Sequence, residues 1–236
     1  MSKRSNNSEI KDVPFSKKKS KGTRASYGKV DYHYQNYSNV MKFLKHNNFK
    51  DVCLFTNGFL HLDIDDIDSG IFLLTDEKYF KIELHKCIRG SDKFIPIILN
   101  LITKNENHAN ILLINKKTKK IELYEPHGSR TSSSTLGGVA GAYRKKVKVL
   151  KIFFNKILPK YDVINSVDYQ KGTAFQMDKD PENHSGFCVT WTILFIHYRI
   201  LNPNIQLSRL IQYLAKKITT LKLLQYARYI EDTLKK

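Results

Sequence analysis

Cysteine is scarce in this chain of 236 residues. The three cysteines are Cys53, Cys87 and Cys188, and no two of them form a Cys-x-x-Cys pair. An odd number without such a pair argues against a disulfide framework and against a zinc site built on cysteine pairs. The pattern fits a reducing compartment and leaves room for one functional thiol.

Long apolar stretches are also missing. No run reaches the roughly 18 apolar residues that a membrane-spanning helix needs. The N-terminus is polar and basic, so it lacks the apolar centre of a secretory signal. We therefore expect an intracellular protein that has no membrane span and is not secreted through a signal peptide.

Acidic residues are few relative to basic ones. The chain has 22 Asp and Glu against 40 Lys and Arg, which gives a formal net charge of +18. Such a surplus attracts polyanions, and nucleic acid is therefore one candidate partner, but the surplus says nothing about the fold. Because many lysines are scattered along the chain, an equally good interpretation is that they only keep the protein surface hydrated and bind no polyanion.

The first 30 residues differ in composition from the rest. Residues 1–30 are rich in Ser, Lys, Asn and Gly and have few apolar side chains. Such a segment cannot offset the entropy lost on ordering, so we expect a flexible basic tail followed by a single domain at 31–236. Its lysine cluster at 17–19 is typical of a nuclear address or a nucleic-acid contact, although a solubilising tail is the simpler interpretation.

Beyond the tail, the hydrophobic pattern predicts an α+β domain. Short continuous apolar runs are typical of buried strands, and apolar residues spaced three or four apart are typical of helices. The expected strands are 51–55, 94–102, 108–115, 121–125 and 161–167, and the expected helices are 37–49, 142–158, 187–201, 208–218 and 221–234. The alternation at 121–125 predicts one solvent-facing side for that strand. Together these elements predict a mixed central sheet with flanking helices.

An acidic stretch around residues 63–68 contains four aspartates. Their spacing departs from the EF-hand pattern, and no terminal Glu follows in place. We therefore expect a solvated loop there, and no metal or cofactor is expected for the chain.

Three residues that are distant in the sequence have the chemistry of a thiol hydrolase. His108 begins one strand of an expected hairpin and Glu125 ends its partner, 17 residues later, so antiparallel pairing brings the two together. A carboxylate beside an imidazole fixes its tautomer and supports its charged form. Cys188 begins a helix, where the helix dipole favours thiolate over thiol. Gln176, upstream of it, is a candidate amide donor to the oxyanion that forms when a thiolate attacks a carbonyl.

Other interpretations of these residues are open. A histidine at a strand end is usually a surface or packing residue, and a cysteine in an apolar helix usually belongs to the core. His127 follows Glu125 closely, and His184 lies four residues before Cys188, so each is an alternative base. It is the joint arrangement that favours catalysis.

Several blocks of the sequence are similar to those of one family. The block 108–115 closes at Leu-Tyr-Glu (123–125), and Gln176 is followed by Ser-Gly-Phe-Cys-Val-Thr-Trp (185–191). This order of His, acid, Gln and Cys resembles that of the SUMO-specific and adenovirus maturation proteases. The phrases at 125–128 and 186–203 are most similar to predicted peptidases of large DNA viruses, and the resemblance covers about residues 94–203.

The resemblance implies a papain-like α+β peptidase. Cys188 would then be the nucleophile, His108 the general base, Glu125 the group that orients it, and Gln176 the oxyanion donor. The implied substrates are viral structural precursors or ubiquitin-like conjugates. If the source is a virus, the implied location is the host cytoplasm or the virion.

Three positions depart from the family pattern. Ala109 replaces the aromatic residue that usually follows the histidine, which changes the shape of the site. The 12 residues from Gln176 to Cys188 exceed the usual gap, so Gln170 is the alternative oxyanion donor. Phe187 stands where SUMO proteases commonly have Asp, which weakens the case for SUMO as the substrate.

Two functions of other classes compete with peptidase activity. The first is a catalytically inactive member of the fold that acts as a basic nucleic-acid-binding or scaffold protein, through the basic helix at 142–158 and the tail. The second is an acyltransferase that uses the same thiol. The presence of His108, Glu125 and Cys188 together favours catalysis over the inactive scaffold.

Overall fold

The structure is a computed structural model of the whole chain. It describes residues 9–17, 37–47, 49–55, 58–63, 71–72, 77–102, 107–126, 128, 140–170, 175 and 187–235.

A six-stranded mixed sheet forms the centre of the fold, in the order β2-β1-β3-β4-β5-β6. The strands are β1 (Phe59–Asp63), β2 (Ile71–Phe72), β3 (Phe94–Ile102), β4 (Asn107–Asn115), β5 (Lys120–Tyr124) and β6 (Asp162–Asn165). The β1–β3 and β5–β6 pairs are parallel, and the other three pairs are antiparallel. The β4–β5 hairpin turns at residues 116–119, between the two strands that were expected to form a hairpin.

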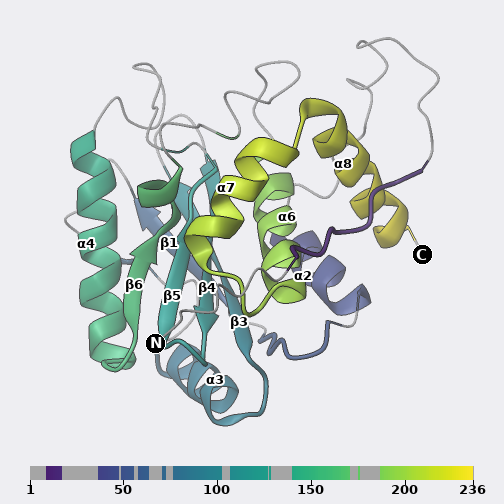
Figure 1. Cartoon of the computed structure of the whole chain (residues 1–236). Helices are drawn as coiled ribbons and strands as arrows, with labels where there is room; N and C mark the ends of the chain where they lie inside the picture. Colours follow the sequence, from purple (N-terminus) through teal and green to yellow (C-terminus); the bar gives the residue numbers. More distant parts are fainter. Residues whose placement is uncertain are drawn as a thin grey trace, which may run out of the picture.

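Helices cover both faces of the sheet (Figure 1). The helices α3 (Glu77–Arg89) and α4 (Ala140–Ile157) lie against one face, and α2 (Tyr37–His46), α6 (Phe187–Leu201), α7 (Leu207–Lys217) and α8 (Thr220–Leu234) lie on the other. Side chains alternate along β4, so that Leu112 and Ile114 enter the α3–α4 core while Ile111 and Leu113 enter the α6 core. Because both faces are covered, β3 and β4 can be apolar along most of their length.

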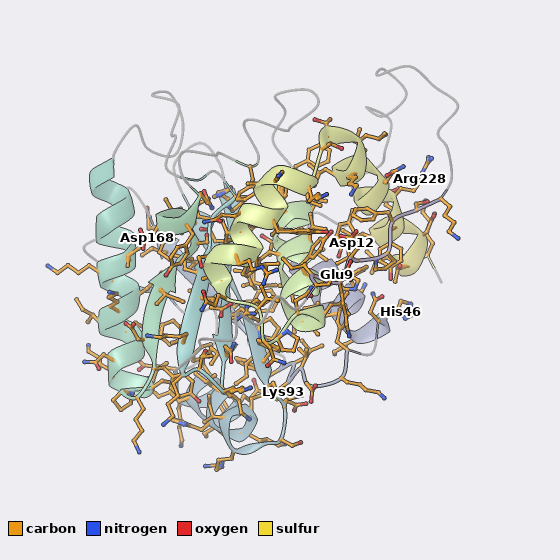
Figure 2. The ribbon with its side chains drawn as sticks, in the orientation of Figure 1. Glu9, Asp12, His46, Lys93, Asp168 and Arg228 are labelled. Atoms are coloured by element: carbon orange, nitrogen blue, oxygen red, sulfur yellow. A yellow bond between two sulfur atoms is a disulfide. The ribbon has the colours of Figure 1, made fainter. Side chains whose placement is uncertain are left out.

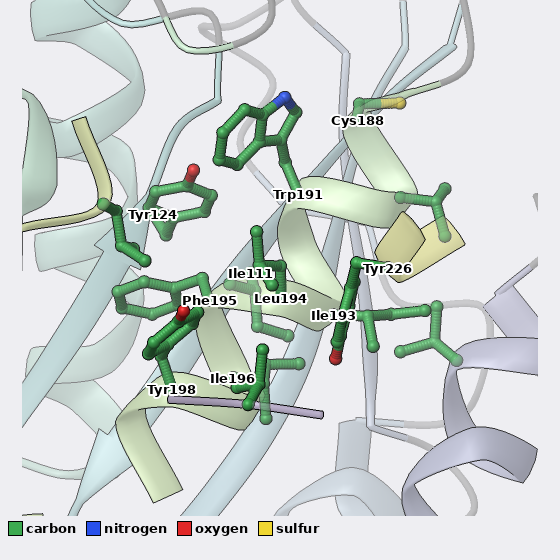
Figure 3. Close-up of a cluster of buried hydrophobic side chains, with 14 of the residues drawn as sticks. Ile111, Tyr124, Cys188, Trp191, Ile193, Leu194, Phe195, Ile196, Tyr198 and Tyr226 are labelled. Atoms are coloured by element: carbon green, nitrogen blue, oxygen red, sulfur yellow. The ribbon is translucent and has the colours of Figure 1, made fainter. Parts of the chain in front are cut away.

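Helix α6 runs through the larger core and is buried along nearly its whole length. Tyr124 of β5 stacks flat on Phe195 of α6, with ring centroids 4.4 Å apart and planes 2° from parallel (Figure 3). Figure 3 also shows Cys188 and Trp191 nearer the N-terminal end of this helix. The aromatic packing fixes α6 on the sheet, and Cys188 thereby lies beside the start of the central strand β4.

The expected α+β class is confirmed, and the bounds of β3 and α6 coincide with those expected. The segment 51–55 is not a strand, because only Val52 pairs, through an isolated bridge to Phe94. Strands β1 and β2 and helix α3 were not expected. The buried residues of α3 are at positions 80, 84 and 87, and this spacing of apolar residues in the sequence is typical of a helix. The last expected strand ends at Asn165 and continues as a 3-10 helix, η2 (Ser166–Tyr169).

The expectation that one side of β5 faces solvent is wrong. Glu122 would be the solvent-facing residue, yet it is buried and forms an ion pair with Arg199 of α6. Alternation in the sequence marks the two faces of a strand, but a buried cation makes a polar face compatible with the core.

The expectation that the cysteines form no disulfide is also wrong. Cys53 and Cys87 are disulfide-bonded, with their Cα atoms 5.6 Å apart although 34 residues separate them. The bond joins the segment after the Val52 bridge to the end of α3. Cys188 is the free cysteine, and it is buried.

Part of the expected tail is ordered on the helices (Figure 2). Within residues 9–17, Val13 is buried, and Asp12 Oδ1 accepts hydrogen bonds from the hydroxyls of Tyr198 at 2.8 Å and Tyr213 at 2.6 Å. The backbone of Lys11 also exchanges two hydrogen bonds with the side chain of Asn202. Residues 9–17 therefore pack against the helices and are not part of a wholly flexible tail. The expected boundary at residue 30 lies outside the described residues.

Candidate active site

The hairpin brings the predicted base and acid together. His108 lies near the start of β4 and Glu125 directly follows β5, and both are buried. His108 Nε2 lies 2.7 Å from Glu125 Oε1. Because Nε2 is taken by the carboxylate, Nδ1 is the ring nitrogen left for a second partner.

That second partner is the thiol of Cys188, the second residue of α6. The thiol is hydrogen-bonded to the His108 side chain, and the backbone N–H groups of Ala109 and Val189 donate to the sulfur. Helix α6 thus begins beside the start of β4, with its N-terminus directed at the sulfur. The structure therefore brings Cys188, His108 and Glu125 into one hydrogen-bonded chain.

The surroundings of Cys188 and His108 favour an ion pair between them. Burial raises the pKa of the Cys188 thiol, but the hydrogen bond and charge of His108 and the two N–H donors lower this pKa by more. Burial opposes a charge on His108, yet Glu125 and Cys188 outweigh it and raise the pKa of His108 to about 9. A thiolate beside an imidazolium is the reactive form of a cysteine nucleophile.

Glu125 is held by its backbone as well as its side chain. Its N–H donates to Ser166 Oγ at 3.2 Å, and its carbonyl accepts a hydrogen bond from Gln170 Nε2 at 2.9 Å. Both partners come from the η2 region that follows β6. The contacts of Gln170 therefore place this residue beside the acid, where it supports Glu125.

A lysine that the sequence analysis missed completes the surroundings of the acid. Lys146 of α4 is buried, and its Nζ lies 2.6 Å from Glu125 Oε2. A signal was present in the sequence, because Lys146 lies four and eight residues before Leu150 and Phe154 on the buried stripe of α4. A lysine in line with such a stripe indicates a buried charge that needs a partner.

The remaining predicted site residues cannot be placed. Gln176, His127 and His184 lie outside the described residues, as does the acidic stretch at 64–70. The oxyanion donor accordingly stays a prediction. Among the described residues, no group of three or more His, Cys, Asp or Glu could hold a metal ion. Within the same part of the chain, no helix is long and apolar enough to cross a membrane.

No protein-family model matches the sequence. Among curated proteins, the chain is 26% identical over 140 residues to a protein of Acanthamoeba polyphaga mimivirus that is named as an ankyrin repeat protein. The match covers 53% of this chain and 18% of the viral protein. The chain thus spans less than a fifth of the length of this curated relative.

Solved structures give a wider match. The effector protein ChlaDUB1 of Chlamydia trachomatis has a TM-score of 0.52 at 9% identity, covering 90% of this chain and 89% of that one. The C. trachomatis effector Cdu1, solved bound to ubiquitin, has a TM-score of 0.50 at 9% identity, covering 84% and 91%. The SUMO protease Ulp1 matches with a TM-score of 0.47 at 10% identity, covering 87% and 81%.

The chain has the fold of the ubiquitin-like cysteine proteases. This confirms the resemblance that the order of His, acid and Cys blocks indicated. In this ubiquitin-like protease fold, Ala109 is buried next to the nucleophile and contributes its backbone N–H to the sulfur. The small residue that replaces the usual aromatic one therefore still contributes to the site through its backbone.

Proposed function

We propose that this chain is a cysteine peptidase in which Cys188 is the nucleophile, His108 the general base and Glu125 the orienting acid. The observation that carries the proposal is the continuous hydrogen-bonded chain from Cys188 through His108 to Glu125. The fold of the ubiquitin-like cysteine proteases supports it. Gln176 is the proposed donor to the oxyanion.

The proposed reaction has two halves. The thiolate of Cys188 attacks the carbonyl carbon of the substrate, and the carbonyl oxygen becomes an anion that Gln176 stabilises. The His108 imidazolium gives its proton to the leaving amine as the C–N bond breaks, which leaves a thioester. His108 then takes a proton from water, which attacks the thioester, and the C–S bond breaks to release the acid and restore the nucleophile.

The proposed substrates are ubiquitin-like conjugates or viral structural precursors, with small residues before the scissile bond. Cdu1, whose structure contains bound ubiquitin, supports the ubiquitin-like alternative, and the mimivirus relative supports the viral one.

Covalent probes test the catalytic proposal. A peptide aldehyde or a ubiquitin or SUMO vinyl sulfone should label the wild-type protein at neutral pH and should not label C188S. The H108A variant should react at least about 100-fold more slowly because the base is lost. The matched control is H46A, which removes an exposed histidine on α2 and should react like the wild type. Absence of labelling in the folded wild-type protein would support the inactive scaffold instead.

Cleavage products separate the substrate classes. Comparison of new N-termini produced by wild type and by C188S, in cells and in lysates of infected cells, should reveal cuts after small residues. Release of free ubiquitin or SUMO from conjugates identifies the first class, and cuts in viral precursors identify the second. Transfer of the acyl group to an added lysine or hydroxyl acceptor, without hydrolysis, would instead support the acyltransferase alternative.

Nucleic acid is a further proposed partner, independent of the thiol. Lys148 and Lys151 are exposed on the solvent side of α4, and the chain carries a net charge of +18, both of which support it. Binding to duplex DNA should weaken as salt rises, and replacing both lysines with Gln should reduce the salt slope by about two. C188S should bind like the wild type, and salt-independent binding would contradict the proposal.

A further inference from the structure

Lys146 is the one lysine in the described helices that lies in the interface between α4 and the sheet with its charge directed at the candidate site. Only 3% of its surface is exposed. Lysine is almost never buried to this degree unless it is paired. Its Nζ lies 2.6 Å from Glu125 Oε2 and 3.4 Å from Asn110 Oδ1, so both of its described partners lie on the hairpin that carries His108.

The two oxygens of Glu125 are divided between two cationic partners. Oε2 contacts Lys146 at 2.6 Å, and Oε1 contacts His108 Nε2 at 2.7 Å. With Cys188 beyond His108, the four groups form a chain in which the charges alternate: ammonium, carboxylate, imidazolium, thiolate. Their sum is zero when His108 is protonated and Cys188 is a thiolate, which is the form that reacts.

Few other ionisable groups face this chain in the described residues. The ionisable groups that meet here are Lys146 of α4, His108 of β4, Tyr124 of β5, Glu125 directly after β5, and Cys188 of α6. Tyr124 packs on the α6 side against Phe195. The contacts from the η2 region to Glu125 come from the neutral side chains Ser166 and Gln170. Within the described contacts, Lys146 places a positive charge on the carboxylate oxygen that does not contact the histidine.

We propose that Lys146 is a positioning residue for the candidate triad, which fixes the orientation of Glu125 and favours the thiolate form of Cys188. The inference rests on the proposed peptidase function and adds to it a fourth, charged member. Two charge-assisted hydrogen bonds, one on each oxygen, hold the carboxylate so that Oε1 remains aligned with His108 Nε2.

The electrostatic role follows from charge balance. Without Lys146, the carboxylate, imidazolium and thiolate would sum to one negative charge in a buried site. Such a cluster binds a further proton more readily, either on the sulfur or on the carboxylate. Protonation of the sulfur removes the nucleophile, and protonation of Glu125 removes the charge that stabilises the imidazolium. In either case the thiolate forms only at higher pH.

The test is the pH dependence of alkylation of Cys188 by iodoacetamide, under conditions that leave the Cys53–Cys87 disulfide intact. Cys188 is then the only free thiol, because all three cysteines lie in the described residues. In K146M, which keeps the apolar length of the side chain, the rise of the rate with pH should move upward by about one pH unit. K146R keeps the charge and should react close to the wild type. The matched control is K160M, an exposed lysine just beyond α4, which should leave the profile unchanged.

A second variant keeps the test possible if K146M does not fold. Removing one partner of a buried ion pair is strongly destabilising, so folding is checked by circular dichroism. If K146M does not fold, K146Q removes the charge while its amide can still donate to Glu125, and the same upward shift is expected.

Each outcome separates this inference from the proposed function. A wild-type protein that reacts like an ordinary thiol, with a rise near about pH 8.5, contradicts the peptidase proposal itself. A wild-type protein that reacts at low pH, with K146M or K146Q superimposed on it, overturns only the role of Lys146. An equal shift in K146M and K146R indicates a packing effect and also overturns the electrostatic role.

Discussion

Arg199 of α6 and Glu122 of β5 form a buried ion pair with two contacts, Nε to Oε2 at 2.7 Å and Nη2 to Oε1 at 2.8 Å. The remaining terminal nitrogen of Arg199 donates to the carbonyls of Asn202 and Ile205, which follow the end of the helix. Helix α6 is therefore fixed to the sheet near its C-terminal end by this pair, while its N-terminal end carries Cys188. The ion pair lies far along the helix from the sulfur, yet it helps to set where the sulfur lies.

Breaking this pair should destabilise the fold. In R199M the Glu122 carboxylate is left buried without a partner, which is expected to lower the free energy of unfolding by about 3–5 kcal/mol. Urea denaturation followed by fluorescence of the single tryptophan measures the change. The control is K120A, which removes the exposed ion pair between Lys120 and Asp162 on the neighbouring strands and should cost less than about 1 kcal/mol. Equal effects of the two substitutions would contradict the structural role of Arg199.

Peptide hydrolysis and alkylation should differ at high pH. Glu125 and Cys188 raise the pKa of His108 to about 9, so the imidazolium is present below that pH and is lost above it. Hydrolysis needs the imidazolium to protonate the leaving amine, so its kcat/KM should fall as the pH passes about 9. Alkylation needs only the thiolate and should not fall. A hydrolysis rate that keeps rising through this range would show that His108 does not act as the acid.

The two glutamines near the site should have distinguishable roles. Gln176 is the predicted oxyanion donor, and its replacement by Ala should lower kcat by about 100- to 1000-fold with little effect on stability. Gln170 donates to the carbonyl of Glu125, so Gln170→Ala should lower the stability of the folded protein as well as the activity. Kinetics combined with thermal unfolding of both variants make the comparison. A large kcat effect of Gln170→Ala with unchanged stability, and none for Gln176→Ala, would reverse the assignment.

The Cys53–Cys87 disulfide can be tested by counting the thiols that react before and after reduction. Alkylation of the denatured but unreduced protein should add one group, on Cys188, and alkylation after reduction should add three. The C53S/C87S double variant should be less stable by about 2–4 kcal/mol, because the bond constrains the unfolded chain. Intact mass and urea denaturation provide the two measurements. Three alkylated sites before reduction would show that the purified protein lacks the bond, and C188S, with none expected, is the control.

The sequence by itself determines the parts of this protein that depend on local patterns. The bounds of β3 and α6 follow from continuous apolar runs that end in polar or proline-containing segments. The closeness of His108 and Glu125 follows from the turn midway between them, since antiparallel pairing is fixed by the position of the turn. The position of Cys188 at the start of a helix is likewise local.

Other features depend on how distant elements pack, and only the tertiary structure decided them. Lys146 lies on the buried stripe of α4, but the packing of α4 against the β4–β5 hairpin decides that its partner is Glu125. No spacing in the sequence indicates that Cys53 and Cys87 form a disulfide. Glu122 has the sequence pattern of a solvent-facing residue, but in the fold it is paired with Arg199, 77 residues away in the sequence. Periodicity marks which face of an element is buried, whereas the partner of a buried charge or thiol is chosen by packing between elements.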